Sequence, residues 1–421
     1  MRPMTPDAEF QRFRALQQAI VKVTEALAWG LAAAMGAKGQ PGSIDPGGPW
    51  SKDEWRNAEV AATIHGIAPL LWRHRWGVDR DAPASWGPFI ETQADENRRR
   101  IERIGSVRNA LTQAATSRDC RLLILKGCDI GGWLYDDPSL RPMADIDVLI
   151  EPWALAGFDA VARLAGLLPV ATTSRHRTYA LDGRVESPYF GEHVDNPIKL
   201  DVHTVVGGLT DGFADAFTRR AWSKATRRQD GSGEWLGLDL SGLATHLLVH
   251  TSENAANRTA RFVQLTDLHL LARHGLDWDE VDSILREGAL GWRVFPALSL
   301  VEQYFPGTAP STLVERARRS TSLGARYVMR NGIARFSFCD LVDQDPAARL
   351  TGTPNLTSFA RLAVRELMFT NQEAPDGRAA WTQGEVRQRR RNRIDRLLAW
   401  IFGRPAYRKG ALEAFMTRRG A

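Results

Sequence analysis

The sequence predicts an α+β protein in which a small mixed β-sheet is flanked by N-terminal helices and a larger C-terminal helical region. Two observations favour this class. Short alternating or continuously apolar runs, which are typical of strands, are confined to roughly residues 120–206, and apolar residues recur at helical spacing before and after that stretch. The 421 residues are 43% hydrophobic and 25% charged, a globular composition that excludes disorder of the whole chain.

The first part of the chain is expected to be helical. Residues 7–35 have the pattern of one helix, and the glycines and prolines of 36–49 predict a linker. Apolar residues recur at helical spacing over 52–76, where Pro69 predicts a helix boundary. A second long helix is expected through 101–114.

The hydrophobic period then changes from that of helices to that of strands. Residues 121–125 form a short apolar run that ends at Lys126-Gly127, and a helical pattern resumes over 130–135. Residues 144–150 alternate and then become continuously apolar. A helix beginning near Pro152 and ending near Gly166 is expected to follow.

An Asp-Gly pair within 181–184 predicts a hairpin between strands at 177–180 and 185–190, because Asp-Gly supports the positive φ angles of a tight turn. Residues 198–206 form another alternating strand. After Gly208 the pattern is helical almost throughout, with helices expected over 240–250, 262–274, 281–290 and 294–305.

Cysteine content and apolar runs predict a cytoplasmic protein. Three cysteines without a CxxC pair exclude a disulfide framework and favour a reducing compartment. The longest early apolar run, 27–35, has about half the length of a membrane span, so no transmembrane helix is expected. Asp7, Glu9 and Arg14 interrupt any signal-peptide pattern.

The net charge of +6 comes from the C-terminal tail. Residues 361–421 contain 14 basic and 6 acidic residues, whereas the preceding 360 have a net charge of −2. Within this tail, 387–402 combines arginines with an apolar cluster, a pattern that suits contact with RNA, with an anionic membrane, or with the body of the protein. Docking on the body, or a solvated helix, is the default interpretation.

Three aspartates are the strongest candidates for chemistry. Asp145 and Asp147 are two residues apart on a predicted strand, so both carboxylates project from one face. Asp201 has the same phase in its own strand and would join them if the two strands are neighbours. Clustered carboxylates repel unless they are protonated or bound to a cation, and an oxygen-only ligand set favours Mg²⁺ or Mn²⁺. Two such ions about 3.5–4 Å apart can support displacement at phosphorus.

A phosphate site is predicted just ahead of these aspartates. Lys126-Gly127 lies where a strand opens into a helix, so backbone amides and the helix N-terminus face an incoming anion. Glycine permits close approach of the backbone, and Lys126 adds a positive charge. The alternative for Lys126 is a strand-end lysine that points into solvent.

The run 125–150 resembles the signature of the bacterial uncharacterised nucleotidyltransferase family, a branch of the DNA polymerase beta-like nucleotidyltransferase superfamily. The shared pattern is a strand, Lys-Gly, a short helix ending in Tyr, a loop with Pro and Leu-Arg-Pro, and then Asp-x-Asp. Asp201-Val-His203 is similar to the family's third carboxylate strand. The resemblance covers about residues 52–290.

The resemblance implies a catalytic site in which Asp145, Asp147 and Asp201 hold two Mg²⁺ ions that bridge a nucleoside triphosphate. Asp201 would help to deprotonate the acceptor hydroxyl, and Gly127 would face the phosphates. The superfamily usually has Gly-Ser at the strand-to-helix turn, whereas Cys128 follows the glycine here. Lys126 and Arg141 are therefore the candidates for the missing phosphate contact, Arg141 because its planar fork suits phosphate oxygens.

Several residues near this signature have competing interpretations. Arg141 could instead pin its loop through backbone carbonyls. His203 shares the face of Asp201 and could orient a carboxylate or touch substrate, but a core histidine bound to a carbonyl is an equal alternative. Asp267 is expected to pair with Arg261 or His250 in a structural role. The pair His246/His250 has i, i+4 spacing and no acidic partner, which makes it a weak metal signal.

Five segments follow from the patterns and the resemblance. They are an N-terminal helix and Gly/Pro linker (1–50), an N-terminal helical segment (51–118), a nucleotidyltransferase catalytic core (119–210), a helical domain packed on the core (211–305), and a C-terminal helical region with the basic tail (306–421).

The function implied is metal-dependent transfer of a nucleoside monophosphate, most simply AMP from ATP, to a hydroxyl of an unidentified acceptor, with release of pyrophosphate. The resemblance favours a peptide or small-molecule acceptor over RNA, since members of the family occur beside genes for peptide natural products. Two alternatives stay open: a non-catalytic nucleotide-binding or adaptor protein that retains the fold, and a phosphotransferase.

Overall fold

The computed structural model describes most of the chain up to residue 361. The predicted linker beyond residue 37 and the basic tail beyond residue 361 lie outside the described residues. Among the residues described, no helix is both long and apolar enough to cross a membrane. The described residues are 6–37, 50–77, 82–172, 176–187, 189–209, 211–231, 233–341, 348, 350–355, 357, 358 and 361.

A five-stranded mixed sheet lies within the predicted stretch and confirms the α+β class. Its strand order is β1-β2-β5-β4-β3, and β2 and β5 form its parallel pair, whereas the other neighbours are antiparallel. The central strand β5 thus enters between β2 and β4, two strands that precede it in the chain. The bounds are β1 Leu122–Leu125, β2 Asp145–Ile150, β3 Leu167–Thr172, β4 His176–Leu181 and β5 Lys199–His203.

The hairpin predicted around 181–184 is wrong, because the strand before the turn pairs with an earlier strand and not with residues 185–190. Asp182 and Gly183 do form the turn, with φ angles of 54° and 71°. This turn leaves β4, but the described residues of 185–190 form no strand. The antiparallel partner of β4 on its outer side is instead β3, which precedes it. The sequence pattern missed β3 because Pro169 lies inside it, and proline is tolerated there since β3 is an edge strand.

A second, two-stranded sheet was also not predicted. Strands β6 (Thr226–Asp230) and β7 (Gly233–Gly237) form an antiparallel hairpin in a region expected to be helical. Polar side chains dominate β6, and two of the five residues of β7 are glycines, so the apolar period that marks a strand is weak. The buried Trp235 of β7 anchors the hairpin by donating a hydrogen bond to Asp129 Oδ1 at 2.9 Å.

The predicted helices are present, with two changes. The stretch 52–76 is divided into two helices and Pro69 lies in the first turn of the second, as expected for a boundary. The expected helix over 152–166 begins as a 3-10 turn at Pro152–Ala156. The α-helices are α1 Pro6–Ala34, α2 Lys52–Ile64, α3 Ala68–Arg73, α4 Trp86–Ser117, α5 Lys126–Leu134, α6 Phe158–Leu164, α7 Asp211–Ser223, α8 Leu240–Asn257, α9 Phe262–Arg273, α10 Trp278–Glu287, α11 Gly291–Tyr304, α12 Ser311–Arg319 and α13 Leu323–Val328.

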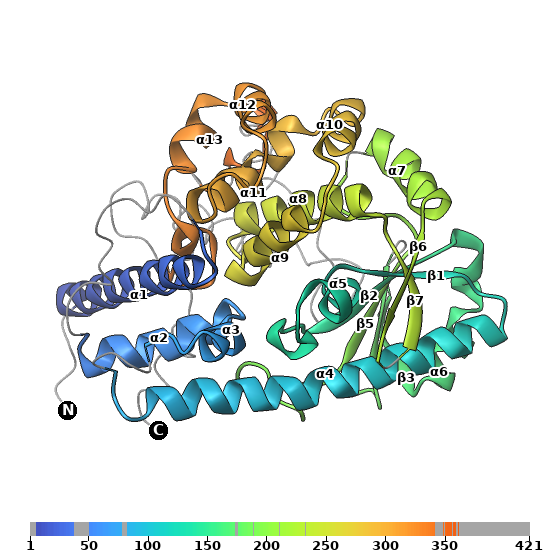
Figure 1. The fold of residues 1–421 in the computed structure, drawn as a ribbon, viewed down its shortest axis with the longest axis horizontal. Helices are drawn as coiled ribbons and strands as arrows, with labels where there is room; N and C mark the ends of the chain where they lie inside the picture. The colour runs from blue at the N-terminus through green and yellow to red at the C-terminus, as the bar shows by residue number, and fades with distance from the viewer. Residues whose placement is uncertain are drawn as a thin grey trace, which may run out of the picture.

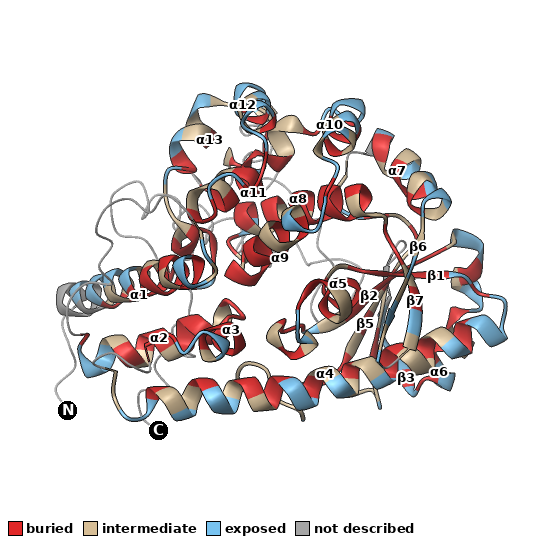
Figure 2. Ribbon diagram, in the orientation of Figure 1, coloured by how far each residue is buried: buried red, intermediate tan, exposed pale blue. Residues whose placement is uncertain are grey.

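The long helix α4 runs alongside both the N-terminal helices and the sheet, while α8 and α9 lie over α5 (Figure 1). Buried residues dominate α8 and α9, in contrast to the outer helices α10 and α12 (Figure 2). The five-stranded sheet and helices α8 and α9 therefore meet across α5, the helix that begins at Lys126.

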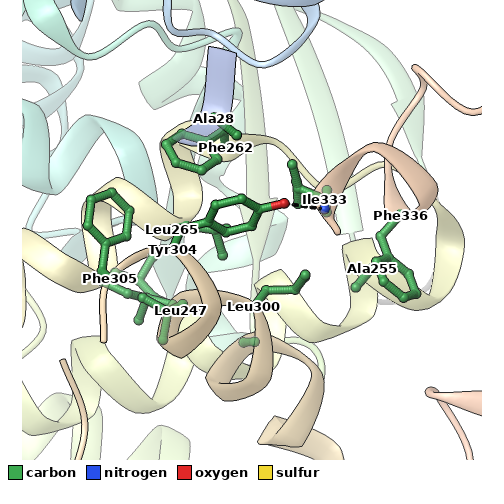
Figure 3. Packing of buried hydrophobic residues seen from close by; sticks show 14 of the residues in the cluster. Ala28, Leu247, Ala255, Phe262, Leu265, Leu300, Tyr304, Phe305, Ile333 and Phe336 are labelled. Atoms are coloured by element: carbon green, nitrogen blue, oxygen red, sulfur yellow. Dashed lines mark hydrogen bonds between the residues drawn. The ribbon is translucent and has the colours of Figure 1, made fainter. Parts of the chain in front are cut away.

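The helical core is centred on Tyr304 of α11, which lies near Phe262 and Phe305 (Figure 3). Its hydroxyl accepts a hydrogen bond from the backbone N–H of Ile333 at 2.8 Å and donates one to Glu25 of α1. Burial raises the pKa of Glu25 above its usual range. These bonds fasten α1 onto the C-terminal helices.

His65 joins the N-terminal helical segment to α9. The imidazole is buried at the end of α2, and its Nδ1 accepts a hydrogen bond from the backbone N–H of Phe262 at 3.0 Å. The His65 carbonyl accepts a further bond from Val263 N–H at 3.2 Å. Burial, assisted by the charge of Arg261, lowers the pKa of His65 to about 3. The folded protein thus holds this imidazole neutral.

We expect this histidine to make the fold acid-sensitive. Its pKa is about 6.5 when unfolded and about 3 when folded, so its contribution to stability is complete above pH 6.5 and is lost as the pH falls toward 3. His65→Asn keeps an acceptor for Phe262 and removes the titration. It should reduce the slope of unfolding free energy against pH by up to about 1.4 kcal/mol per pH unit.

Urea unfolding at several pH values between 7.5 and 5 measures this slope. The control is His274→Asn, which removes an exposed histidine and should leave the slope as it is in the wild type. Equal slopes for wild type and His65→Asn would show that His65 is not the source of the acid sensitivity.

Candidate active site

The parallel pairing of β2 with β5 brings the three predicted aspartates together. Asp147 is directly opposite Asp201 in the register, and Asp145 is opposite Lys199. In β5 the alternate residues Leu200 and Val202 are buried, which turns Asp201 to the less buried face. Because residues paired in a sheet project to the same side, and Asp145 and Asp147 are two residues apart, all three carboxylates share one face.

Lys126 and His203 lie at the centre of this face. Lys126 Nζ donates a hydrogen bond to Asp147 Oδ1 at 2.8 Å, and His203 Nε2 lies 3.0 Å from the same oxygen. Thr178 of β4 donates to Asp201 Oδ1 at 2.8 Å. Lys126 has a positive φ of 51° where β1 opens into α5. The lysine therefore points to the carboxylates and not into open solvent, the alternative that the sequence left open.

Electrostatics show that this face requires positive charge. Burial, followed by the charge of Asp147, raises the pKa of Asp145 to about 6. Burial acts in the same direction on Asp147, but the hydrogen bond with His203 and the ammonium of Lys126 outweigh it and hold its pKa well below the usual range. Burial lowers the pKa of Lys126, but the carboxylates outweigh that effect and raise it. Lys126 is thus a built-in counter-charge to the aspartates.

The donor chemistry of this face suits a hard divalent cation, because all three acidic ligands are carboxylates. A cation already lies there in the form of the Lys126 ammonium, whose pKa responds to Asp147, Asp145 and Asp201 alike. As they stand, the described residues include no group of three or more His, Cys, Asp or Glu side chains arranged to hold a metal ion. Lys126 and His203 both contact Asp147 through Oδ1.

Gly127 and Arg141 lie next to each other, but the Arg141 guanidinium binds Asp267. A Cβ atom on Gly127 would lie 2.1 Å from Arg141 Nη1, so the absence of a side chain makes room for the guanidinium. Arg141 donates to Asp267 through Nη2 at 2.7 Å and Nε at 3.2 Å. Arg141 Nη1 also donates to the Pro142 carbonyl at 3.0 Å. A phosphate contact by Arg141 or Gly127 stays a prediction, alongside this observed structural role.

Asp267 joins α9 to the active-site segment. It is fully buried and accepts hydrogen bonds from Arg141 and from Tyr135 at the end of α5, the latter at 2.6 Å. The structural role expected for Asp267 is therefore observed, but its partners are Arg141 and Tyr135 and not Arg261 or His250. The two partners are 126 and 132 residues away in sequence, a pairing that local spacing does not reveal.

The burial of Cys128 accounts for a cysteine at the position where the superfamily usually has the serine of Gly-Ser. Its thiol is buried in the hydrophobic cluster beneath the sheet, and burial raises its pKa to about 12. Residue 128 is thus a core position in this chain. A thiol that stays protonated among apolar side chains supplies no hydroxyl-like contact to phosphate.

His246 and His250 lie one turn apart on α8, the helix that packs against α5. The charges of Lys126 and Asp147 act on the pKa of both histidines. Burial lowers the pKa of His250 to about 3 and that of His246 further below its usual range, so both are neutral at pH 7. Within the described residues, His246 Nδ1 is buried without a hydrogen-bond partner. The i, i+4 spacing was the available signal, and it marks neutral imidazoles on the helix above the site.

We expect the loss of one partner of the buried pair Arg141–Asp267 to cost more stability than the loss of one partner of a surface ion pair. Arg141→Met leaves a buried carboxylate without its cation, and Asp267→Leu leaves a buried guanidinium without its anion. Each should lower the free energy of unfolding by about 3–5 kcal/mol. The double variant should be more stable than the sum of the two losses indicates, because neither charge is then stranded. Denaturant unfolding of the four proteins measures this coupling, and strictly additive losses would contradict it.

Comparisons with known proteins agree with the resemblance seen in the sequence. The model of a family described as "Uncharacterised nucleotidyltransferase" matches residues 51–306. No curated protein matches the chain.

Two solved structures resemble parts of it. One is the antibiotic-resistance factor ANT(2'')-Ia, with 12% identity, 44% of this chain and 94% of that chain covered, and a TM-score of 0.32. The other is an antigenic nucleotidyltransferase-like protein from Paracoccidioides brasiliensis, with 14% identity, 51% and 97% coverage, and a TM-score of 0.30. Both likenesses are distant, whereas the family model covers more than half of the chain. The chain therefore belongs to the uncharacterised nucleotidyltransferase family, which supports nucleotidyl transfer as its general activity.

Proposed function

We propose that the protein transfers a nucleoside monophosphate, most simply AMP from ATP, to a hydroxyl of an acceptor in a reaction that depends on divalent metal ions. The observation that carries this proposal is the in-register pairing of Asp147 with Asp201, which puts three carboxylates and Lys126 on one face. In the reaction an acceptor oxygen forms a bond to the α-phosphorus, and the bond from that phosphorus to pyrophosphate breaks.

Asp145, Asp147 and Asp201 would hold the ions, with Mg²⁺ preferred and Mn²⁺ as a substitute. When bound, a pair of such ions would neutralise charge on the triphosphate and on the entering and leaving oxygens. Asp201 would accept the proton of the acceptor hydroxyl. Asp201 Oδ1 accepts a hydrogen bond from the Thr178 hydroxyl, which orients the carboxylate on its strand.

Lys126 and His203 would act on the two sides of Asp147. Lys126 donates to Asp147 Oδ1 in the absence of nucleotide, and this ammonium would turn to a phosphate oxygen once the triphosphate enters. His203 lies 3.0 Å from the same carboxylate oxygen and would keep Asp147 oriented while Lys126 moves. The first backbone amides of α5 would add donors for the phosphates.

The acceptor is proposed on the family resemblance to be a peptide or a small molecule. Its hydroxyl would approach the carboxylate face from the side of α8, where the charges of Lys126 and Asp147 reach His246 and His250. Of this pair only His250 is partly exposed, since His246 is buried, and its neutral imidazole would offer a hydrogen bond to a polar group of such an acceptor without adding charge to the site.

Removing the carboxylates should abolish the reaction without unfolding the protein. Asp145→Asn and Asp147→Asn each remove a metal ligand, so we expect the transfer rate to fall by a factor of about 10² or more. The unfolding midpoint should not fall for Asp145→Asn, because the substitution relieves repulsion between buried carboxylates. The control is Asp279→Asn, an exposed position at the start of α10, which should retain wild-type activity.

The assay uses ATP labelled either at the α- or at the γ-phosphate, with Mg²⁺ and a pool of candidate acceptors. Nucleotidyl transfer predicts acceptors labelled by α-labelled ATP together with pyrophosphate release, whereas a phosphotransferase would label them only from γ-labelled ATP. Thermal stabilisation by Mg²⁺-ATP without any turnover would instead favour nucleotide binding alone. Labelling that survives in Asp145→Asn would refute the catalytic assignment.

A further inference from the structure

Arg100, in the middle of α4, is buried with 3% of its surface exposed, and its guanidinium lies between the two chain segments that lead into β2 and β5. Figure 1 shows α4 passing along the sheet on the way from the N-terminal helices to α6. The surroundings of Arg100 include the entrance to both strands that carry the aspartates.

The guanidinium donates to backbone carbonyls on both sides. On the β2 side Nε lies 3.4 Å from Met143 O and Nη2 lies 3.1 Å from Ala144 O, the last two residues before the strand. On the β5 side Nη1 donates to Asn196 O at 2.7 Å and Nη2 to Pro197 O at 3.1 Å, just before that strand begins. One side chain thus binds the amino ends of both parallel strands.

The same loop is fastened to α4 at neighbouring positions. Arg100 Nη1 also approaches His193 O at 3.4 Å, and the Glu192 carboxylate lies 3.2 Å from Arg100 Nε and balances its charge. One turn before and one turn after Arg100, Glu96 accepts from Val194 N–H at 3.1 Å and Arg103 donates to Val194 O at 2.7 Å. This face of α4 therefore sets where the chain enters β5.

The register of β2 and β5 needs such a device. Parallel strands are joined by long crossovers and not by tight turns, so no hairpin loop sets their alignment. A slip of one residue would replace the Asp147–Asp201 pairing and turn Asp201 to the opposite face of the sheet. Arginine suits the task because its five N–H donors form a rigid planar fork, whereas lysine offers three donors from a single point.

We propose that Arg100 is a positioning residue of the active site, which holds the entrances of β2 and β5 in register so that Asp145, Asp147 and Asp201 can share a metal site. The inference rests on the proposed function in so far as these carboxylates bind metal. Arg100 itself makes no hydrogen bond or ion pair with the three aspartates.

Arg100→Lys in the full-length protein tests this role, with Arg108→Lys as the matched control. Arg108 is on the same helix and is equally buried, with 3% exposed, but its guanidinium binds Asp230 of the β6–β7 hairpin. Each variant replaces a planar guanidinium on α4 with a lysine ammonium. Both variants are measured at a temperature well below the lower of their two unfolding midpoints, so that both are folded.

Two readouts separate positioning from general stability. The first is amide hydrogen exchange, which should become faster in β2 and β5 in Arg100→Lys, whereas in Arg108→Lys any increase should be confined to the hairpin. The second is Mn²⁺ affinity measured by electron paramagnetic resonance, which should fall about 10–100-fold in Arg100→Lys and stay unchanged in Arg108→Lys.

Unchanged exchange in β2 and β5, or equal Mn²⁺ affinity in the two variants, would overturn the positioning role. A wild-type protein that binds no Mn²⁺ would contradict the proposed function, and the exchange measurement would then decide the role of Arg100 in strand register by itself. The two failures are therefore distinguishable.

Discussion

The mutual repulsion of three carboxylates on one sheet face is the constraint around which the rest of the structure is arranged. Asp145, Asp147 and Asp201 are brought together by two parallel strands whose side chains alternate between core and site. Isolated in this partly buried position, they would favour protonation or separation. Lys126 supplies the opposing charge, and its position at the start of α5 makes the strand-to-helix turn and the carboxylate cluster one electrostatic unit.

Buried polar contacts connect this unit to the helices around it. Asp267 of α9 holds Arg141 against Gly127 and binds Tyr135, so the segment between the lysine and the aspartates is fixed to α9 at two points. His65 in turn binds α9 to the N-terminal helices. The carboxylate face therefore depends on the five-stranded sheet and on the helical segments together.

Local patterns predicted the parts of the fold in which one face is apolar. The alternation in β2 and β5 is clear, so the strands and the shared face of the aspartates could be inferred before their neighbours were known. The sequence does not predict strand β3 because its proline argues against a central strand. It does not predict the β6–β7 hairpin because polar side chains dominate β6 and glycines begin and end the short strand β7. The pairing of Arg141 with Asp267 depends on how distant segments pack, which neither residue spacing nor composition encodes.

A crystal structure of the protein with Mn²⁺ and a non-hydrolysable nucleoside triphosphate would show whether the three aspartates share a metal site, because anomalous scattering locates manganese without ambiguity. We expect manganese within coordination distance of carboxylate oxygens from Asp145, Asp147 and Asp201, with Lys126 moved onto the triphosphate. Manganese bound elsewhere, or a triphosphate seated away from α5 with Lys126 still on Asp147, would contradict this expectation.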